Sequence, residues 1–275
     1  MHRAFLAQMA RISVRCVAVP SVAVAISVSV SLSCASDANA QVNTEPLRRK
    51  LKIIKGWAFT VQGSLDAREG NTQGIDVSTG GGIGFAKARH LAFIFGSAEY
   101  ARYNNTESID NSFLHARYNY EVLDWLWGEA YVQLQSDKFQ RILLRDLVGL
   151  GPRFGLYQSP SFDVYLGTGW MVEHDAINAI PGSGDRTDFY AHRWNNYISA
   201  NYSLDTRVSF ASSLYVQPRF NDFSDRRILE ETSITFKITP VLAASIVGSY
   251  HYNSDPPTGV RSIDLDIKNV ISVTY

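Results

Sequence analysis

The stretch SIDLDIKNVISVTY, residues 262–275, alternates apolar and polar side chains along its length. Its odd-numbered positions are almost all apolar: Ile263, Leu265, Ile267, Asn269, Ile271, Val273 and Tyr275. Its even-numbered positions carry mainly charged or hydroxyl groups: Ser262, Asp264, Asp266, Lys268, Val270, Ser272 and Thr274. Because successive side chains of a strand point to opposite faces, this stretch predicts a β-strand with one apolar face and one polar face.

An aromatic residue closes this strand. Ile271, Val273 and Tyr275 stand at alternate positions, a pattern that resembles the C-terminal signal of bacterial outer-membrane β-barrels. In those barrels the apolar face meets lipid and the polar face meets a watery lumen. We therefore expect these three residues to form a barrel-assembly signal, with the barrel-assembly machinery, periplasmic chaperones and outer-membrane lipids as partners.

The composition argues against two classes of protein. The 275 residues hold 26 Lys and Arg against 26 Asp and Glu, so the net charge is zero and no nucleic-acid partner is expected. The mean hydropathy of −0.10 argues against a bundle of membrane-spanning helices.

The N-terminal residues 1–40 predict a signal peptide. A basic start, an apolar run and a small-x-small cleavage site follow one another: Arg3, Arg11 and Arg15, then Val17–Leu32, then Ala38-Asn39-Ala40. Cleavage before Gln41 would remove both cysteines, Cys16 and Cys34, so the mature chain would contain no disulfide. The alternative, a lipidated Cys34, is disfavoured because the preceding residues match a lipobox poorly. We expect residues 41–55, which follow the cleavage site, to form a periplasmic N-terminal segment.

From Gly56 onward, period-two segments alternate with turn residues, which predicts an all-β fold. The expected strands lie near 57–66, 75–85, 90–103, 112–122, 127–136, 144–157, 161–174, 188–203, 208–220, 227–238, 241–252 and 262–275. We therefore expect a single antiparallel up-and-down transmembrane β-barrel of about twelve strands over residues 56–275. Strand 90–103 fits least well, since Leu91, Phe93 and Phe95 lie opposite Ile94. The glycines Gly80–Gly82 would allow tight curvature or a close approach of whatever fills the lumen.

The polar face of these strands carries charges of both signs. The lumen-lining candidates are Arg117, Glu129, Arg145, Arg153, Glu173, Arg193, Arg219 and Glu231. About twelve strands make a barrel wider than the eight-stranded kind that side chains fill, and narrower than open porins of about 16–18 strands. The mixed charges could therefore line a narrow pore or form a salt-bridged plug.

The connections alternate in length, being short after even-numbered strands and longer after odd-numbered strands. Two of the longer loops are expected at 104–111 and 221–226. Short periplasmic turns, long outer loops and an even strand count place both termini in the periplasm of a cell outer membrane.

A soluble periplasmic lipid-binding barrel shows the same alternation with its apolar face turned inward, so periodicity alone does not exclude it. Aromatic residues near the strand ends favour a membrane barrel, because they form girdles at the two interfaces. These residues are Trp57, Tyr103, Trp125, Trp127, Tyr157, Phe162, Tyr250, Tyr252 and Tyr275.

Several short motifs carry a family resemblance. They are Gly70-Asn71-Thr72, Tyr118-Asn119-Tyr120-Glu121 before Trp125, the segment 145–153 (RDLVGLGPR), Gly167-Thr168-Gly169 before Glu173, and the loop 255–260 (DPPTGV). With them, residues 56–275 resemble the YdiY-like "salt-induced outer membrane protein" family, whose domain has no known function. The resemblance implies an outer-membrane barrel with a link to osmotic or salt response. Pro152 departs from the family pattern and suggests a local bulge.

No catalytic or metal-binding constellation stands out. His174, beside Glu173 and Asp175, is the best candidate for a lipid-acting enzyme at the barrel rim, and His192 is a second, but neither has a recognisable active-site spacing. Asp264 and Asp266 could bind Ca²⁺, although pairing with lumen Arg or Lys is favoured. We expect no enzymatic activity, no cofactor and no metal, and a structural role or a narrow pore for small solutes.

Overall fold

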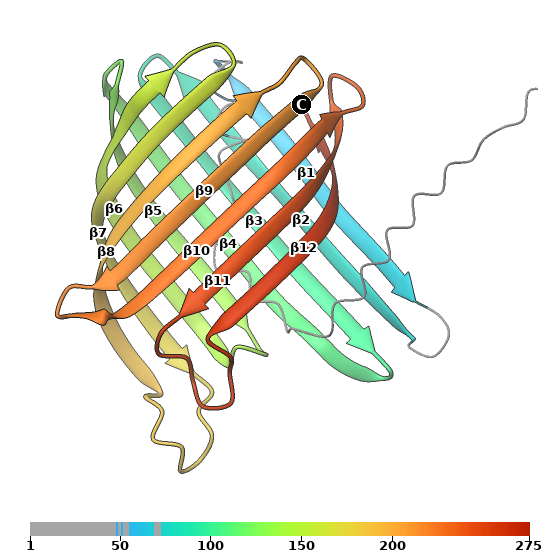
Figure 1. Ribbon diagram of the computed structural model, residues 1–275, viewed down its shortest axis with the longest axis vertical. Helices are drawn as coiled ribbons and strands as arrows, with labels where there is room; N and C mark the ends of the chain where they lie inside the picture. The colour runs from blue at the N-terminus through green and yellow to red at the C-terminus, as the bar shows by residue number, and fades with distance from the viewer. Residues whose placement is uncertain (1–47, 49–50, 52–54, 69–72) are drawn as a thin grey trace, which may run out of the picture. The chain divides into compact units, whose positions relative to one another are not determined.

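The structure is a computed structural model that describes residues 48, 51, 55–68 and 73–275; the predicted signal peptide lies outside this part. Twelve antiparallel strands form one closed barrel (Figure 1). They are β1 (Trp57–Arg68), β2 (Gly74–Lys87), β3 (His90–Tyr103), β4 (Thr106–Leu123), β5 (Leu126–Asp137), β6 (Ile142–Gln158), β7 (Phe162–Ile177), β8 (Asp188–Ser203), β9 (Val208–Arg219), β10 (Asp222–Lys237), β11 (Leu242–Asn253) and β12 (Ile263–Thr274). The predicted antiparallel barrel of about twelve strands is confirmed.

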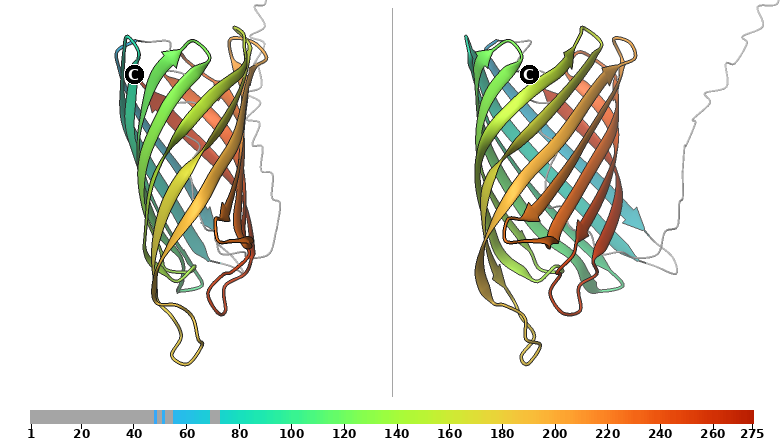
Figure 2. Two further views of the ribbon diagram at one scale, coloured as in Figure 1. Left: turned by 90° about the vertical axis from the view of Figure 1, so that its left-hand side faces the viewer. Right: turned by 60° about the vertical axis from the view of Figure 1, so that its left-hand side comes forward.

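Each strand pairs with its neighbours in sequence, and β12 pairs with β1 to close the ring. The connections after even-numbered strands lie at one end of the barrel, which we call the turn end, together with the beginning of β1 and the C-terminus (Figures 1 and 2). The connections after odd-numbered strands lie at the opposite, loop end. Among the described residues, no helix is long and apolar enough to span a lipid bilayer.

The two faces of the wall have opposite chemistry. On β5, Val132 and Leu134 point outward and are 48% and 44% exposed, whereas Gln133 and Gln135 point inward and are each 2% exposed. A similar alternation holds on β4 and β8, where the inward face is mainly polar but also includes Phe113 and Tyr197. The apolar side chains therefore cover the exterior of the barrel.

The irregular strand β3 places apolar side chains inside. Phe93 and Phe95 are buried in the lumen, while Ile94 is half exposed on the exterior. Glycines on the adjacent β2 provide the space, because a Cβ on Gly80 would lie 3.0 Å from Cζ of Phe95. The expected close approach at this glycine run is therefore present, and it explains the exception on β3.

Two aromatic residues differ from the predicted girdle. Trp57, Trp125 and Tyr275 are exposed on the exterior near the turn end, as expected. Trp127 instead faces the lumen, where it is 4% exposed and packs edge-on against Tyr165. Tyr103 also belongs to the inward parity of β3, and its hydroxyl lies 3.4 Å from Asp76. Both residues lie near strand ends, but their parity places them inside.

Two connections at the loop end are shorter than predicted. β4 begins at Thr106 and β10 at Asp222, so the turns before them contain two residues each, Asn104-Asn105 and Phe220-Asn221. Asn104 and Asn105 have positive φ angles of 48° and 62°, the conformation of a tight hairpin turn. Both strands start with largely polar sequences, which is why the apolar pattern did not reveal them.

Strands β6 and β7 approach each other closely at a pair of glycines. A Cβ on Gly151 would lie 2.1 Å from the backbone oxygen of Thr168, and one on Gly169 would lie 2.4 Å from that of Leu150. The bulge predicted at Pro152 is wrong, because the β6–β7 register is unchanged across it and shifts instead between Gly155 and Tyr157. The β6–β7 ladder is interrupted between Leu150 and Arg153 and resumes in the same register.

This close approach predicts that Gly151→Ala destabilises the barrel by about 1–3 kcal/mol, since the methyl group would overlap backbone atoms that cannot move aside. Gly128→Ala is the matched control, because nothing lies within 4 Å of a Cβ there. Urea unfolding of both variants in detergent, followed by tryptophan fluorescence, measures the difference. Equal midpoints for the two variants would contradict the role of the glycine pair.

Candidate functional site in the barrel lumen

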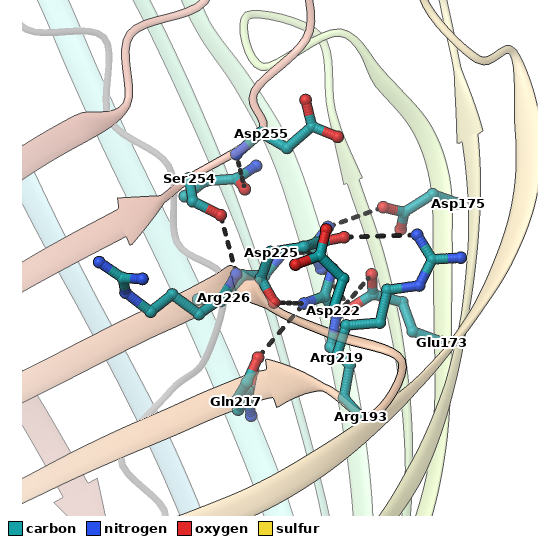
Figure 3. A network of polar contacts seen from close by, with 12 residues as sticks. Glu173, Asp175, Arg193, Gln217, Arg219, Asp222, Asp225, Arg226, Ser254 and Asp255 are labelled. Carbon is teal, nitrogen blue, oxygen red and sulfur yellow. Dashed lines mark hydrogen bonds and ion pairs between the residues drawn. The ribbon is translucent and has the colours of Figure 1, made fainter.

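A chain of ion pairs lies in the lumen toward the loop end (Figure 3). We call it the loop-end cluster; it contains Arg145, Glu173, Asp175, Arg193, Arg219, Asp225 and Arg227. Arg145 binds Asp175 through two contacts, Nε to Oδ1 at 2.6 Å and Nη2 to Oδ2 at 3.0 Å. Arg227 bridges Asp175, at 2.8 Å, and Glu173. Since β10 and β7 lie three strands apart in the ring, these contacts cross the lumen.

The cluster continues from Glu173 toward β9 and β10. Nε of Arg193 lies 3.2 Å from Oε1 of Glu173, and Nη2 of Arg193 lies 2.9 Å from Oδ1 of Asp225. Arg219 completes the series with a contact of 3.5 Å to Asp225. Cations and anions therefore alternate along the cluster, and each buried acid contacts at least two guanidinium groups.

A second group of charges lies toward the turn end and is centred on Glu129 of β5. Glu129 accepts hydrogen bonds from Nδ2 of Asn119, at 2.6 Å, and from the hydroxyl of Tyr197 on β8. Arg153 donates to the Tyr197 hydroxyl at 3.0 Å, and its guanidinium lies 3.9 Å from the centre of the Tyr165 ring. The contact between β5 and β8 again spans three strands.

Arg117 belongs to the same group. Its guanidinium lies 5.3 Å from the centre of the Tyr131 ring and attracts Glu129 electrostatically. We name Arg117, Asn119, Glu129, Arg153 and Tyr197 the turn-end cluster.

Two described residues of the N-terminal segment also contact the lumen wall. Leu51 is fully buried and packs with Ala58, Ala86 and Phe93. Arg48 is 4% exposed, and its guanidinium lies 5.0 Å from the centre of the Tyr165 ring. Arg48 and Leu51, which belong to the segment 41–55 that we expect in the periplasm, lie among inward-facing side chains near the turn end. A Cβ on Gly84 would lie 2.2 Å from Cδ1 of Leu51, so that glycine provides space for the leucine.

A third charged group joins β3, β4 and β12. Nζ of Lys268 lies 2.5 Å from Oε2 of Glu99 and 3.1 Å from Oδ2 of Asp266, and Asn111 donates to Glu99 at 3.3 Å. The Asp266–Lys268 contact agrees with the preference for ion pairing over Ca²⁺ binding. Asp264 accepts a hydrogen bond of 3.0 Å from Gln140, which lies in the β5–β6 connection across the mouth. No group of three or more potential metal ligands occurs in the described part of the chain.

The loops also contact one another over the loop end. Asp185, between β7 and β8, accepts hydrogen bonds from the hydroxyl of Thr258, at 2.8 Å, and from its backbone nitrogen, at 3.1 Å. The Thr258 hydroxyl is the main cause of a pKa of Asp185 below the usual range of an aspartate. Arg141 reaches the Thr258 carbonyl oxygen at 3.2 Å. These contacts tie together the connections β5–β6, β7–β8 and β11–β12, above a chamber of about 40 Å³ lined in part by Arg145 and Arg227.

The eight lumen candidates from the sequence divide among these groups. Arg117, Glu129 and Arg153 lie in the turn-end cluster, and Arg145, Glu173, Arg193 and Arg219 lie in the loop-end cluster. Glu231 is half-buried on the inward parity of β10. Sequence reasoning missed the partners Glu99, Asp175, Asp225, Arg227 and Lys268, together with Arg48. Asp175, Asp225 and Arg227 could have been found from their parity. They stand at inward positions of β7 and β10, in the parts of these strands where the apolar alternation has stopped.

The candidate rim histidines lie outside the lumen. His174 is on the outward parity of β7, where its ring nitrogens lie 2.7 Å from Asp146 and 3.3 Å from Asp188, and its ring stacks on Tyr190. None of these partners is a serine, threonine or cysteine. His192 stacks on Trp170 on the exterior, whereas the adjacent Arg193 points inward. The sequence neighbours of His192 are therefore not brought together into a site.

The loop-end cluster predicts that Glu173→Gln lowers the free energy of unfolding by about 3–5 kcal/mol, because two buried guanidinium groups lose a charged partner. The control is Glu107→Gln, the same change in an exposed ion pair with Lys138, which should unfold like the unaltered chain. Urea titration in detergent compares them, and similar curves would show that the cluster does not stabilise the barrel.

The chain is similar to several solved structures. Similar solved structures include the translocator domain of autotransporter NalP from Neisseria meningitidis, with 12% identity, a TM-score of 0.48, and coverage of 84% of this chain and 95% of that chain. A NanC porin gives 12% identity, a TM-score of 0.46, and coverage of 79% and 97%. The KdgM porin gives 10% identity, a TM-score of 0.41, and coverage of 80% and 98%. Identities and TM-scores this low do not indicate which solute this protein would carry or how it would act.

No curated protein matches the sequence. The model of the family described as "Protein of unknown function, DUF481" matches residues 61–274, from within β1 to the end of β12, and the chain therefore belongs to that family.

Proposed function

We propose that the protein is a barrel of a bacterial outer membrane whose lumen is a narrow passage for small polar solutes, and that it has no enzymatic activity. One observation carries the proposal: the exposed exterior is rich in large apolar side chains, while the buried inward face carries many charged and amide side chains among aromatic and apolar ones. A membrane-spanning sheet needs this arrangement, because a closed barrel pairs its backbone groups and lipid covers its apolar face.

The arrangement argues against a soluble periplasmic lipid-binding barrel. Such a barrel would turn its apolar side chains inward around an apolar ligand. Here the inner surface carries Arg117, Glu129, Arg145, Glu173 and Arg193, each less than 9% exposed, in place of a continuous apolar lining.

The width of the passage follows from contacts across the lumen. Arg227 reaches from β10 to β7, and Tyr197 reaches from β8 to β5. Side chains that join strands three places apart in a ring of twelve occupy part of the lumen and narrow it on that side. Small polar solutes are therefore the class that such a passage would admit.

A lipid-acting enzyme at the rim is the second reading, and the surroundings of His174 do not favour it. Its ring contacts Asp146, Asp188 and Tyr190, none of which supplies a serine-type nucleophile. Lipid-turnover assays on the unaltered chain and on His174→Ala would test this reading directly.

The proposal extends to orientation and partners. The beginning of β1 and the end of β12 lie at the turn end, which we assign to the periplasm because short turns face that side in such barrels. Ile271, Val273 and Tyr275 are the proposed signal for the barrel-assembly machinery, and periplasmic chaperones and outer-membrane lipids are the other expected partners. A link to salt response rests on the family resemblance alone.

The membrane location predicts that the protein fractionates with outer membranes, needs detergent for extraction and migrates differently on gels before and after boiling. The physical reason is the apolar exterior, which water cannot solvate, and the ring of strand pairing, which resists detergent until heated. Gel electrophoresis of fractionated cells measures all three properties. Recovery of the folded protein in the detergent-free periplasmic fraction would contradict the location.

The narrow passage predicts small conductance steps in planar-bilayer recordings, and larger steps for Gln135→Ala. Gln135 is buried in the lumen, and its amide makes no hydrogen bond with another described residue, so truncation widens the lumen without breaking a side-chain hydrogen bond. The control, Leu134→Ala, removes a similar volume from the exterior and should conduct like the unaltered chain. Absence of steps at every voltage in all three proteins would contradict the passage and leave a purely structural barrel.

A further inference from the structure

The seam between the first and last strands differs from the rest of the wall. In the described part of the chain, the β1–β12 ladder joins Thr60–Gly63 with Ile271–Thr274, and Phe59 and Tyr275 add two backbone hydrogen bonds of 2.8 Å. On their other sides, β1 pairs with β2 over its full length, and β12 pairs with β11 from Ile263 to Val273. The seam is therefore joined near the turn end and unjoined toward the loop end.

A cavity of about 690 Å³ lies where the two strands part. Residues from both faces of the wall line it. Ser64, Ser245 and Val270 have the inward parity, whereas Leu65, Ile246 and Ile271 have the outward parity and are between 45% and 70% exposed. A volume in the range of about 300–1,000 Å³ is typical of pockets for small organic ligands. The lining therefore includes residues of both parities, next to the part of the seam where β1 and β12 are not paired.

The lining of the cavity is uncharged, and its outer and inner parts differ in polarity. No lining residue is Asp, Glu, Lys or Arg. The outer part offers isoleucine and leucine side chains to a hydrocarbon chain. The inner part contains the hydroxyls of Ser64 and Ser245, which pair with those of Ser78, at 2.7 Å, and Thr235, at 2.9 Å, and each can form one further hydrogen bond. An unjoined seam would also leave strand backbone groups in lipid without ladder partners, which is costly unless a polar group reaches them.

A charged group on the inward face of β12 disfavours an anionic ligand at this seam. Lys268 lies two positions from Val270 on the same face, and it contacts the carboxylates of Glu99 and Asp266. Two carboxylates against one ammonium give this group a net negative charge. An anionic head would be repelled here, whereas a hydroxyl-bearing head without charge would not.

We propose that the β1–β12 seam is a lateral binding site for a single-chain amphiphile with an uncharged, hydroxyl-bearing head. Its chain lies against Leu65, Ile246 and Ile271, and its head points to Ser64 and Ser245. The site gives such a molecule a route between the bilayer and the lumen. This inference requires the membrane location proposed above, and it does not require conductance along the barrel axis.

A photoactivatable monoacylglycerol tests the site on protein purified from membranes and reconstituted in phospholipid vesicles. We expect saturable labelling of the peptides around residues 63–65, 244–246 and 269–271, which unlabelled monoacylglycerol abolishes. A fatty acid of the same chain length, which is anionic, should compete less well. Non-saturable labelling spread evenly around the barrel would overturn the proposal, because it would reflect ordinary contact with the bilayer.

Paired cysteines test whether the seam itself is required. Continuing the register of Thr60 with Thr274 places Ser64 opposite Val270, so oxidised S64C/V270C should close the seam and abolish saturable labelling, which reduction should restore. The control pair T60C/T274C lies in the joined part, where the two hydroxyl oxygens are 3.1 Å apart, and should leave labelling unchanged. Both pairs are made with Cys16 and Cys34 replaced by serine.

A cavity-filling variant covers the case in which the disulfide does not form. Ala244→Trp places an indole in the cavity and should remove saturable labelling, whereas Ala130→Trp, on the exterior of β5 away from the seam, should retain it. Unchanged labelling in A244W, or equal loss in A130W, would overturn the proposal. Heat-modifiable migration of each variant shows that the barrel has folded, which separates failure of this site from failure of the membrane location.

Discussion

Hydrogen bonding between neighbouring strands around a closed ring constrains the rest of the structure. Once each strand is paired on both sides, its side chains have two directions available, into the lumen or out of the barrel. Polar groups that point inward then meet one another, because the ring confines them. The alternation along β5, with Val132 and Leu134 outside and Gln133 and Gln135 inside, is the local form of this constraint.

Confinement explains why the inward charges occur as connected groups. A buried guanidinium without an acid partner is costly, and a buried carboxylate without a donor is costly for the same reason. Glu173 and Asp175 are shared between arginines of three different strands, β6, β8 and β10. Such sharing favours one arrangement of the strands over others, since a register slip on any of them would separate several partners at once.

The fold could be predicted from the sequence more completely than the contacts inside the lumen. Period-two alternation and turn residues predicted twelve strands and the correct faces for Arg117, Glu129 and Glu173. Alternation gave no signal where both faces are polar, so the starts of β4 and β10 were missed. The prediction for Trp127 was wrong because it relied on the position of this residue near a strand end and not on its parity. Partners such as Arg227 for Glu173 depend on how strands three places apart are staggered, which local patterns do not encode.

The joined part of the seam has a consequence for how the barrel forms. Eleven of the twelve strand pairings link neighbours in sequence, so each can form as a hairpin at small cost in chain entropy. The pairing of Thr60 with Thr274 links positions 214 residues apart and provides few backbone bonds in return. Ring closure therefore costs the most chain entropy for each backbone hydrogen bond that it forms. Before β1 and β12 meet, the growing sheet would be an open, curved ribbon.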